Sequence, residues 1–228
     1  MATGNLRGIR RSGSTVECLA GTPMSEVSER AADWDLAGLE TFYSMPGSVG
    51  GSIWINARCY EVSLSESLQY VDIVDVSGEE IRVAVDEVEF SYKRSPFQSM
   101  EALILAGGFR LVPGDGSASR RRMGQFRRDR EQKGHFLHPC AGSFFKNNRD
   151  FGMPTGKIID ALGLRGLRVG GAMVSEAHAN IIVNTGDATA DQIWRLAQEV
   201  KRRVRDAYGF VLEEEIIRVG DWEAGHGG

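Results

Sequence analysis

Residues 138–148 read His-Pro-Cys-Ala-Gly-Ser-Phe-Phe-Lys-Asn-Asn. Gly142 lets a substrate approach the backbone closely beside the hydroxyl of Ser143. The two phenylalanines that follow can exclude water from one side of that hydroxyl. Lys146 and Asn147 can bind anionic or carbonyl oxygens. These residues alone support two interpretations equally: a turn into a buried strand, and a reactive segment that binds a substrate.

The composition is that of an ordinary soluble protein. The chain has 228 residues, of which 42% are hydrophobic and 25% are charged. That is enough for one large domain or two smaller ones with a buried core. No apolar run reaches the length that spans a bilayer, and the N-terminal residues lack the apolar core of a signal peptide. We therefore expect a cytoplasmic protein that does not enter a membrane.

The charged, cysteine and histidine residues exclude several other classes. A net charge of −4 argues against a general polyanion binder. The cations at 118–133 could suggest nucleic-acid binding, but the carboxylates between them favour a solvated helix face. Cys18, Cys59 and Cys140 are widely spaced, and neither they nor the four histidines have the spacing of metal ligands or of a disulfide framework. We expect no metal, and we interpret Cys140 as a small buried residue.

Hydrophobic periodicity predicts an α+β chain with a turn cluster at 113–117 between its two parts. Thr22 is the expected N-cap of a helix that ends near Asp33. Thr189 and Gln192 form an expected capping box, and Gly209 should end the helix that they begin. Strands are expected at 14–21, 102–112, 181–184 and 210–217, a hairpin at 69–76 and 80–85, and further helices at 118–133 and 157–162.

A glycine-rich loop is formed by Pro46, Gly47, Ser48, Val49, Gly50 and Gly51. Its glycines free the backbone to bend and to present bare N–H groups, which suit a pyrophosphate or the polar edge of a ring cofactor. The loop is neither a Walker A loop nor a Gly-x-Gly-x-x-Gly motif after a strand. On composition alone, a structural turn is the commoner interpretation of such a loop.

Three consecutive carboxylates, Glu213, Glu214 and Glu215, lie in the last expected strand. Such a run is usually a solvated acidic surface. The alternation of side chains along a strand places Glu213 and Glu215 on one face and Glu214 on the other. We therefore expect the three carboxylates in two different surroundings.

Several of these segments, in the same order, resemble those of the UDP-N-acetylenolpyruvoylglucosamine reductases, flavoenzymes that complete UDP-N-acetylmuramic acid for peptidoglycan. The resemblance covers nearly the whole chain to Gly220. It rests on Gly-Ser-Phe-Phe-Lys-Asn at 142–147, the glycine-rich loop followed by Ile-Trp-Ile-Asn-Ala at 53–57, Tyr-Lys-Arg-Ser at 92–95, Leu-Arg-Gly at 164–166, Gly-Gly-Ala at 170–172, Val-Ser-x-x-His-Ala-Asn at 174–180 and Leu-Glu-x-Glu at 212–215.

The resemblance implies an α+β fold in two parts. Residues 1–113 correspond to the remainder of a flavin-binding domain, and residues 117–220 to a smaller substrate-binding domain, with a disordered tail at 221–228. Family members carry a further N-terminal subdomain, whose Gly-rich loop holds the flavin diphosphate, and the resemblance begins downstream of it. A fragment, a misplaced start and a lost half-site are three explanations that the sequence leaves open.

The resemblance also implies a reaction and the residues that perform it. NADPH reduces FAD, and the reduced flavin gives hydride to the enolpyruvyl group of a UDP-sugar; a monomer is expected. Ser143 would donate a proton, Lys93 would stabilise the developing negative charge, and Glu215 would orient the site or a water. The glycine-rich loop and Asn56 are the implied flavin-binding residues, and Tyr92, Lys133, Lys146, Asn147 and His178 are the candidates for substrate binding.

Two residues depart from the family pattern. Arg58 stands where the family usually has glycine after the Asn-Ala pair, and Lys93 stands where the family has an arginine. Lysine keeps the positive charge, but it replaces a planar, two-pronged donor with a point charge. Two rival interpretations remain: a non-catalytic remnant that binds nucleotide sugars, and another flavin-linked oxidoreductase on the same plan.

Overall fold

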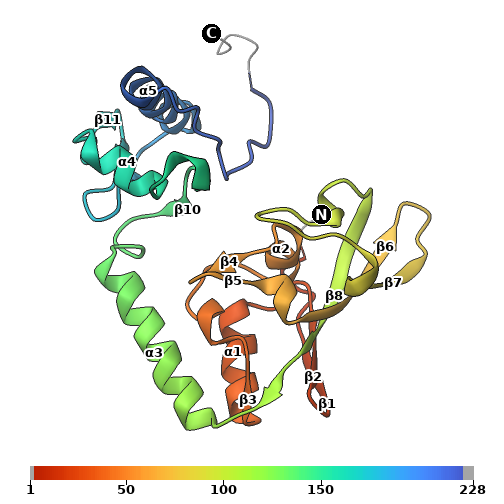
Figure 1. The fold of residues 1–228 in the computed structure, drawn as a ribbon. Coiled ribbons are helices and arrows are strands. Elements are labelled where there is room, and N and C mark those ends of the chain that lie inside the picture. Colours follow the sequence, from red (N-terminus) through yellow and green to blue (C-terminus); the bar gives the residue numbers. More distant parts are fainter. Residues whose placement is uncertain (1–2, 223–228) are drawn as a thin grey trace. The chain divides into compact units, whose positions relative to one another are not determined.

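The computed structural model describes residues 3–222 and has an α+β fold, as predicted. The chain forms two compact units, unit 1 within residues 1–128 and unit 2 within residues 129–228 (Figure 1). The division falls inside a helix and not at the expected turn cluster at 113–117. Each unit is described by itself.

Unit 1 is built on a five-stranded antiparallel sheet with the strand order β1-β2-β8-β6-β7. The predicted hairpin is confirmed as β6 and β7, and the strand expected at 102–112 as β8. The strands are β1 (Ile9–Ser12), β2 (Thr15–Leu19), β6 (Leu68–Asp75), β7 (Glu80–Ala84) and β8 (Ala102–Arg110); two short pairs are β3 (Leu36–Ala37) with β9 (Val112–Pro113), and β4 (Arg58–Cys59) with β5 (Val62–Ser63).

Two helices bury their apolar faces in the core of unit 1. Helix α1 (Met24–Asp33) buries Met24 and Val27, and helix α2 (Val49–Trp54) buries Val49 and Ile53 and packs against β8 and β2. The apolar positions of α1 recur at three- and four-residue spacing, which is the pattern of a helix with one buried face. The single-turn 3-10 helices of this unit are η1 (Glu40–Phe42), η2 (Leu64–Glu66), η3 (Val85–Glu87) and η4 (Pro96–Gln98).

The expected role of Thr22 as an N-cap is wrong. Helix α1 has Pro23 at its N-cap, with no side-chain cap. The hydroxyl of Thr22 instead accepts a hydrogen bond from the N–H of Gly8 at 3.1 Å and donates to the carbonyl of Gly8 at 3.2 Å. The side chain therefore ties the start of α1 to the residue before β1, a strand that was not predicted.

Helix α3 (Gly116–Gln132) spans the division between the two units. Its first turns belong to unit 1, where the Ser119 hydroxyl donates to the carboxylate of Glu40 at 2.7 Å and the N–H of Gly38 donates to the same carboxylate at 3.0 Å. Glu40 is only 7% exposed. Burial acts to raise the pKa of Glu40, but these hydrogen bonds and the charge of Arg122 hold it below its usual value.

Replacing Glu40 with Gln should therefore destabilise unit 1 in a pH-dependent way. Because the folded-state pKa is depressed, the carboxylate contributes stability above its unfolded pKa of about 4.3, and this contribution is lost as the pH falls through the folded-state pKa. Urea denaturation should give a loss of about 1–3 kcal/mol at neutral pH, which shrinks in acid. The exposed Glu29 of α1, changed to Gln, is the control, and an equal loss at both pH values would contradict the assignment.

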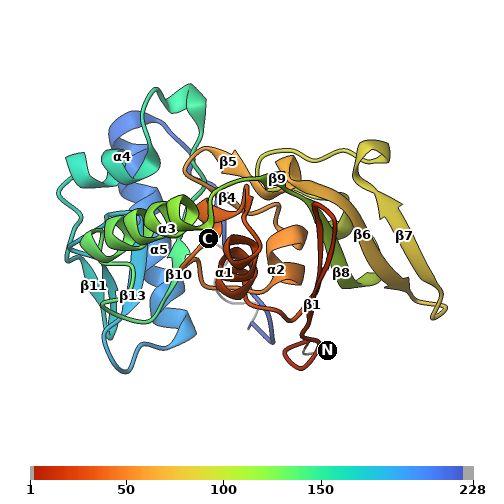
Figure 2. The same cartoon turned by 90° about the horizontal axis from the view of Figure 1, so that it is seen from below.

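Unit 2 is built on a four-stranded antiparallel sheet with the strand order β10-β13-β12-β11. Figure 2 labels β10, β11 and β13 of this sheet. Alternate residues of the strands enter two clusters: Val174 and Ile182 pack with helices α4 and α5, whereas Met173 and Val183 form a smaller cluster. The elements are β10 (Cys140–Ser143), η5 (Arg149–Phe151), α4 (Thr155–Ala161), β11 (Arg168–Val169), β12 (Ala172–Val174), β13 (Ile181–Asn184) and α5 (Ala190–Tyr208).

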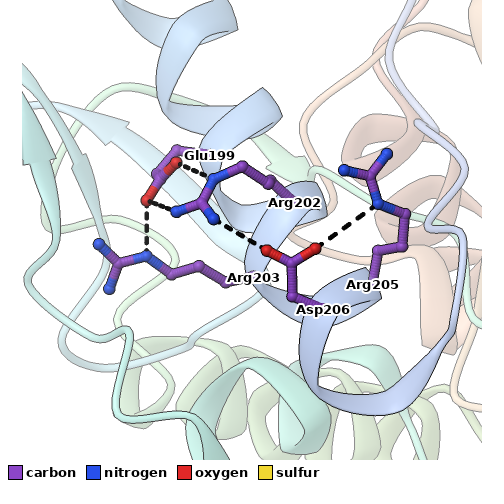
Figure 3. A network of polar contacts seen from close by, with 5 residues as sticks. All are labelled: Glu199, Arg202, Arg203, Arg205 and Asp206. Atoms are coloured by element: carbon purple, nitrogen blue, oxygen red, sulfur yellow. Dashed lines mark hydrogen bonds and ion pairs between the residues drawn. The ribbon is translucent and has the colours of Figure 1, made fainter.

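Helix α5 begins and ends where the sequence predicted. Thr189 and Gln192 form a capping box, and Gly209 ends the helix with φ +73°. On the outward face of α5, Glu199 accepts hydrogen bonds from Arg202 and Arg203, which lower the pKa of Glu199 to about 2 (Figure 3). The cations of this face are therefore paired within the helix.

Two further sequence expectations for unit 2 are wrong. Residues 210–217 form no strand and contribute only an isolated bridge through Glu214. Cys140 is exposed, whereas the buried cysteine of the chain is Cys18, where burial raises the thiol pKa to about 12. The last six residues of the tail expected at 221–228 lie outside the described residues. None of the described helices is both long and apolar enough to cross a membrane.

Candidate functional site

The segment that carries Ser143 ends strand β10 and bends at Phe144. Its pairing with β13 is interrupted by a bulge between Cys140 and Ser143, where Gly142 has φ +82°. That left-handed conformation favours glycine. Phe144 and Phe145 are 3% and 1% exposed and enter the same core. Because the chain bends here, two consecutive side chains are buried together, and Ser143 lies half-buried where the bend begins.

The backbone of the three carboxylates at 213–215 lies beside the segment that follows Ser143. Residues 213–215 run antiparallel to residues 144–146, with an isolated bridge at the centre. The N–H of Glu215 donates to the carbonyl of Phe144 at 2.8 Å. Since Phe144 follows Ser143 directly, the backbone holds the last of the three carboxylates beside the serine segment.

Glu213 and Glu214 lie in different surroundings, as the alternation predicted. Glu214 accepts hydrogen bonds from Lys201 at 2.7 Å and Gln198 at 3.3 Å, both on helix α5. Burial acts to raise the pKa of Glu214, but the hydrogen bonds from Lys201, the backbone and Gln198, together with the charge of Lys201, outweigh burial and lower the pKa. Glu213 forms an ion pair with Lys146 on the other side of the segment. Glu213 and Glu214 are thus each bound to a cation, and the backbone of Glu215 lies next to Phe144.

Lys146 and Asn147, both predicted to bind substrate, also anchor helix α4. The carbonyl of Lys146 accepts from the Thr155 hydroxyl at 2.7 Å, and the side-chain oxygen of Asn147 accepts from the Thr155 N–H at 2.9 Å. Thr155 is fully buried. The charge of Lys146 is partly neutralised by Glu213, so the help that it can give to a reacting oxygen is reduced.

His178 lies in a tight loop between β12 and β13. The hydroxyl of Ser175 accepts from the N–H of His178 at 3.3 Å, which holds the loop closed. Burial, followed by the positive charge of Lys133, lowers the pKa of His178. The ring of His135 packs edge-on against His178 at a centroid distance of 5.7 Å, and burial lowers the pKa of His135 to about 4. Both imidazoles are therefore neutral near pH 7.

Lys133 follows the last residue of α3 and is exposed. Its ammonium pairs with Asp129 at 2.7 Å, one turn earlier in the chain. The charge of Lys133 also lowers the pKa values of both histidines. The structure thus brings the predicted residues Lys133 and His178 into one electrostatic neighbourhood. No group of three His, Cys, Asp or Glu side chains among residues 3–222 is arranged to hold a metal ion.

In unit 1, the glycine-rich loop begins helix α2. The N–H groups of Val49 and Gly50 donate to backbone carbonyls within residues 20–22 at 2.9 and 2.8 Å, and the N–H of Gly51 donates to the hydroxyl of Ser48 at 3.4 Å. The expectation of bare N–H groups is therefore wrong for these three residues. Their donors hold the loop against the end of β2.

Close packing and two remaining donors complete the loop. A Cβ on Gly50 would lie 2.9 Å from the Cβ of Ala20, so only glycine fits this approach. The N–H groups of Gly47 and Ser48 have no acceptor among the described residues, and Pro46 and Gly47 are exposed. The loop therefore presents two neighbouring donors at its exposed end.

Tyr92 and Lys93 form the tip of a tight turn that is closed by two hydrogen bonds of 3.1 Å between Ser91 and Arg94. Lys93 has φ +57°, a conformation that costs a non-glycine residue about 1–3 kcal/mol. The segment is a turn and not an extended strand, so the alternation of side chains along a strand cannot distinguish Lys93 from Arg94. The two cations differ in burial instead, because Lys93 is half-buried and Arg94 is exposed.

The turn is tied to the end of helix α2. The amide of Asn56 donates to the carbonyl of Ser91 at 2.8 Å, and its oxygen accepts from the N–H of Ser65 at 3.2 Å. Gln98 donates to the carbonyls of Trp54 at 3.0 Å and of Lys93 at 3.2 Å. Asn56, a predicted flavin ligand, is 3% exposed and braces this turn.

Arg58, the departure after the Asn-Ala pair, takes part in the β4–β5 hairpin. Its guanidinium bonds to the hydroxyl of Ser63 at 3.2 Å and pairs with Glu61 at 2.6 Å. The hairpin turns through Tyr60 and Glu61, which have φ +49° and +67°. The bulky cation therefore stabilises its own hairpin.

Comparison with known proteins gives consistent matches. Residues 132–219 match the family model for the C-terminal domain of UDP-N-acetylenolpyruvoylglucosamine reductase. The reductase of Treponema denticola is 40% identical over 215 residues, which are 89% of this chain and 67% of that protein. The reductase of Borrelia garinii is 36% identical, with coverage of 96% and 71%. A crystal structure of the Thermus caldophilus reductase matches with a TM-score of 0.73 and 30% identity over 92% of this chain and 71% of that one.

These relatives define the class as reductases, and the solved one shares the fold of this chain. The chain belongs to the UDP-N-acetylenolpyruvoylglucosamine reductase family.

Proposed function

We propose that this chain takes part in the flavin-dependent, NADPH-driven reduction of the enolpyruvyl ether of UDP-N-acetylglucosamine to UDP-N-acetylmuramate, a step in the synthesis of peptidoglycan precursors. Family membership supports the reaction class. The observation that carries the proposal is the pairing of residues 144–146 with residues 213–215, because it joins a hydroxyl segment to a carboxylate. In this proposal unit 1 holds the flavin and unit 2 holds the sugar nucleotide.

The glycine-rich loop fits the polar edge of a flavin. Gly47 and Ser48 offer two N–H donors without an acceptor among the described residues, and their backbone is fixed by the bonds of Val49 and Gly50. Residues 46–51 would therefore hold FAD, and the buried Asn56 would brace the turn at residues 91–94 that carries Lys93. When bound, the flavin would carry hydride from NADPH to the terminal carbon of the enolpyruvyl group.

Ser143 supplies the proton in this proposal. Reduction of the enolpyruvyl carbon leaves negative charge on the adjacent carbon and on its carboxylate, and the serine hydroxyl is the donor that quenches it. An alcohol is a weak acid, so the site must assist the alkoxide that remains. Glu215, held beside Phe144 by its N–H, would orient the hydroxyl or a relay water.

The other candidates hold the substrate and its charge. Lys93, half-buried at the tip of its turn, stabilises the negative charge that develops on the carboxylate of the substrate. Tyr92 forms one wall of the substrate pocket. Neutral His178 and Asn147 donate or accept hydrogen bonds to the sugar nucleotide, and Lys133 provides positive charge for its diphosphate.

Two measurements test the proposal. Purified protein should absorb in the flavin bands after loading with FAD, and it should consume NADPH beyond one equivalent per flavin only when UDP-N-acetylglucosamine enolpyruvate is added. Substrate binding without NADPH consumption would support a non-catalytic remnant. NADPH consumption that does not depend on this substrate would support a different flavin-linked oxidoreductase.

A further inference from the structure

Asn180 is a buried amide to which the sequence assigned no role. It follows His178 in the loop before β13 and is 3% exposed. Helix α4 covers it closely, because a Cβ on Gly156 would lie 3.5 Å from the Cβ of Asn180 and 3.4 Å from the Cε1 of His178. A buried amide in such a place needs partners for both of its ends.

The side chain of Asn180 finds both partners on one residue of the serine segment. Its oxygen accepts from the N–H of Phe145 at 3.0 Å, and its nitrogen donates to the carbonyl of Phe145 at 2.8 Å. The carbonyl of Asn180 also accepts from the N–H of Phe144 at 2.7 Å. Three hydrogen bonds from one residue therefore fix the two residues that follow Ser143, where β10 has ended and the regular ladder has stopped.

The backbone of Asn180 acts on His178 at the same time. Its N–H donates to the Nδ1 of His178 at 3.3 Å, so that Nδ1 must carry a lone pair and the ring proton lies on Nε2. The charged groups around the two histidines are Lys133 and Arg165 for His178, with Arg130, Lys133 and Asp129 for His135. All but Asp129 favour a neutral ring, and a hydrogen bond with the backbone of His178 acts on the pKa of His178 in the other direction.

We propose that Asn180 is a positioning residue, which sets the backbone behind Ser143 through its side chain and the tautomer of His178 through its N–H. The inference rests on the function proposed for Ser143 and His178. Asn180 touches no reacting atom in this account. It holds a proton donor and a substrate-binding imidazole in one geometry.

Asn180→Asp tests the first part of the proposal, which is that the side chain of Asn180 sets the backbone behind Ser143. When the introduced side chain is ionised, it can accept a hydrogen bond from the N–H of Phe145, but it repels the carbonyl of Phe145 and cannot donate to it. When the side chain is protonated, it can both accept and donate. In the flavin-loaded enzyme, reoxidation by substrate should fall about 10²-fold at alkaline pH and recover as the pH falls. Reduction by NADPH should be unchanged throughout. Asn184→Asp, at the end of β13, is the control. The side-chain oxygen of Asn184 accepts hydrogen bonds from the N–H groups of Gly186 and Ala188, which a carboxylate can also accept, so this variant should behave as wild type.

A readout without activity separates this inference from the proposed function. In NMR spectra of Asn180→Asp, the amide signal of Phe145 should titrate together with the introduced carboxyl, and it should not do so in Asn184→Asp. If substrate reoxidised the flavin of Asn180→Asp at the wild-type rate while the introduced carboxyl is ionised, the positioning role would be overturned. Failure of the proposed function has a different signature, which is unchanged reoxidation in Ser143→Ala.

Two further measurements cover the remaining outcomes. If the introduced carboxyl stays protonated, folded Asn180→Leu should still lose about 10²-fold in reoxidation, and wild-type reoxidation there would overturn the proposal. The ¹⁵N signals of the His178 ring should report a proton on Nε2 between pH 6 and 8. A proton on Nδ1 would overturn the assignment of the tautomer.

Discussion

A Ser143→Ala variant is expected to accept electrons from NADPH at the normal rate and to fail in passing them to the substrate. Only the second half-reaction needs a proton donor, and the loss of a positioned acid costs about 10²–10⁴-fold. The small side chain at the end of β10 should leave the fold intact, because the buried residues of this segment are Phe144 and Phe145. Stopped-flow absorbance would record normal flavin reduction and very slow reoxidation by substrate.

The control for this variant is Ser117→Ala, at an exposed position of helix α3. It should match wild type in both half-reactions. If Ser143→Ala reoxidised at the wild-type rate, another group or a water would be the donor. Equal slowing of both half-reactions would instead indicate a damaged flavin site.

Lys93→Ala should have the second large effect, a loss of about 2.7–4 kcal/mol in transition-state stabilisation, or about 10²–10³-fold in kcat. In the proposed mechanism, the alanine removes a half-buried cation that stabilises developing negative charge. Lys93→Arg keeps the charge and should retain much of the activity. Both substitutions keep the turn, whose hydrogen bonds run between the backbones of Ser91 and Arg94.

Arg94→Ala is the matched variant for Lys93→Ala. Both positions lie in the same turn, but Arg94 is exposed, so its loss should change kcat little. Steady-state kinetics on the two alanine variants decide which cation acts. A large fall in kcat for Arg94→Ala with normal turnover in Lys93→Ala would move the role to the arginine.

The features that the sequence predicted depend on local spacing. The capping box of Thr189 and Gln192 and the C-cap at Gly209 each need only a few neighbouring residues. The hairpin of β6 and β7 follows from strand alternation around a short turn. The division of the carboxylates between Lys201 and Lys146 also follows from alternation, although no regular strand forms there.

The features that were missed depend on partners distant in the sequence. The hydroxyl of Thr22 binds Gly8, 14 residues away, and so cannot cap its helix. Asn180 binds Phe145, 35 residues away, and no pattern within a single sequence joins these two positions. The turn at Lys93 was missed because its left-handed residue is a lysine, whereas glycine or asparagine is the usual signal for such a turn.

The pairing of residues 144–146 with residues 213–215 also has a consequence for the order in which the protein is made. The ion pair of Lys146 with Glu213 spans 67 residues. At a synthesis rate of about 5–20 residues per second, the serine segment waits for several seconds before its carboxylate partner exists. Contacts so distant in sequence form late, because loop closure must come first. A nascent or truncated chain that ends at helix α5 would leave the N–H of Lys146 and the carbonyl of Phe144 without these partners, and so open to pairing with another chain.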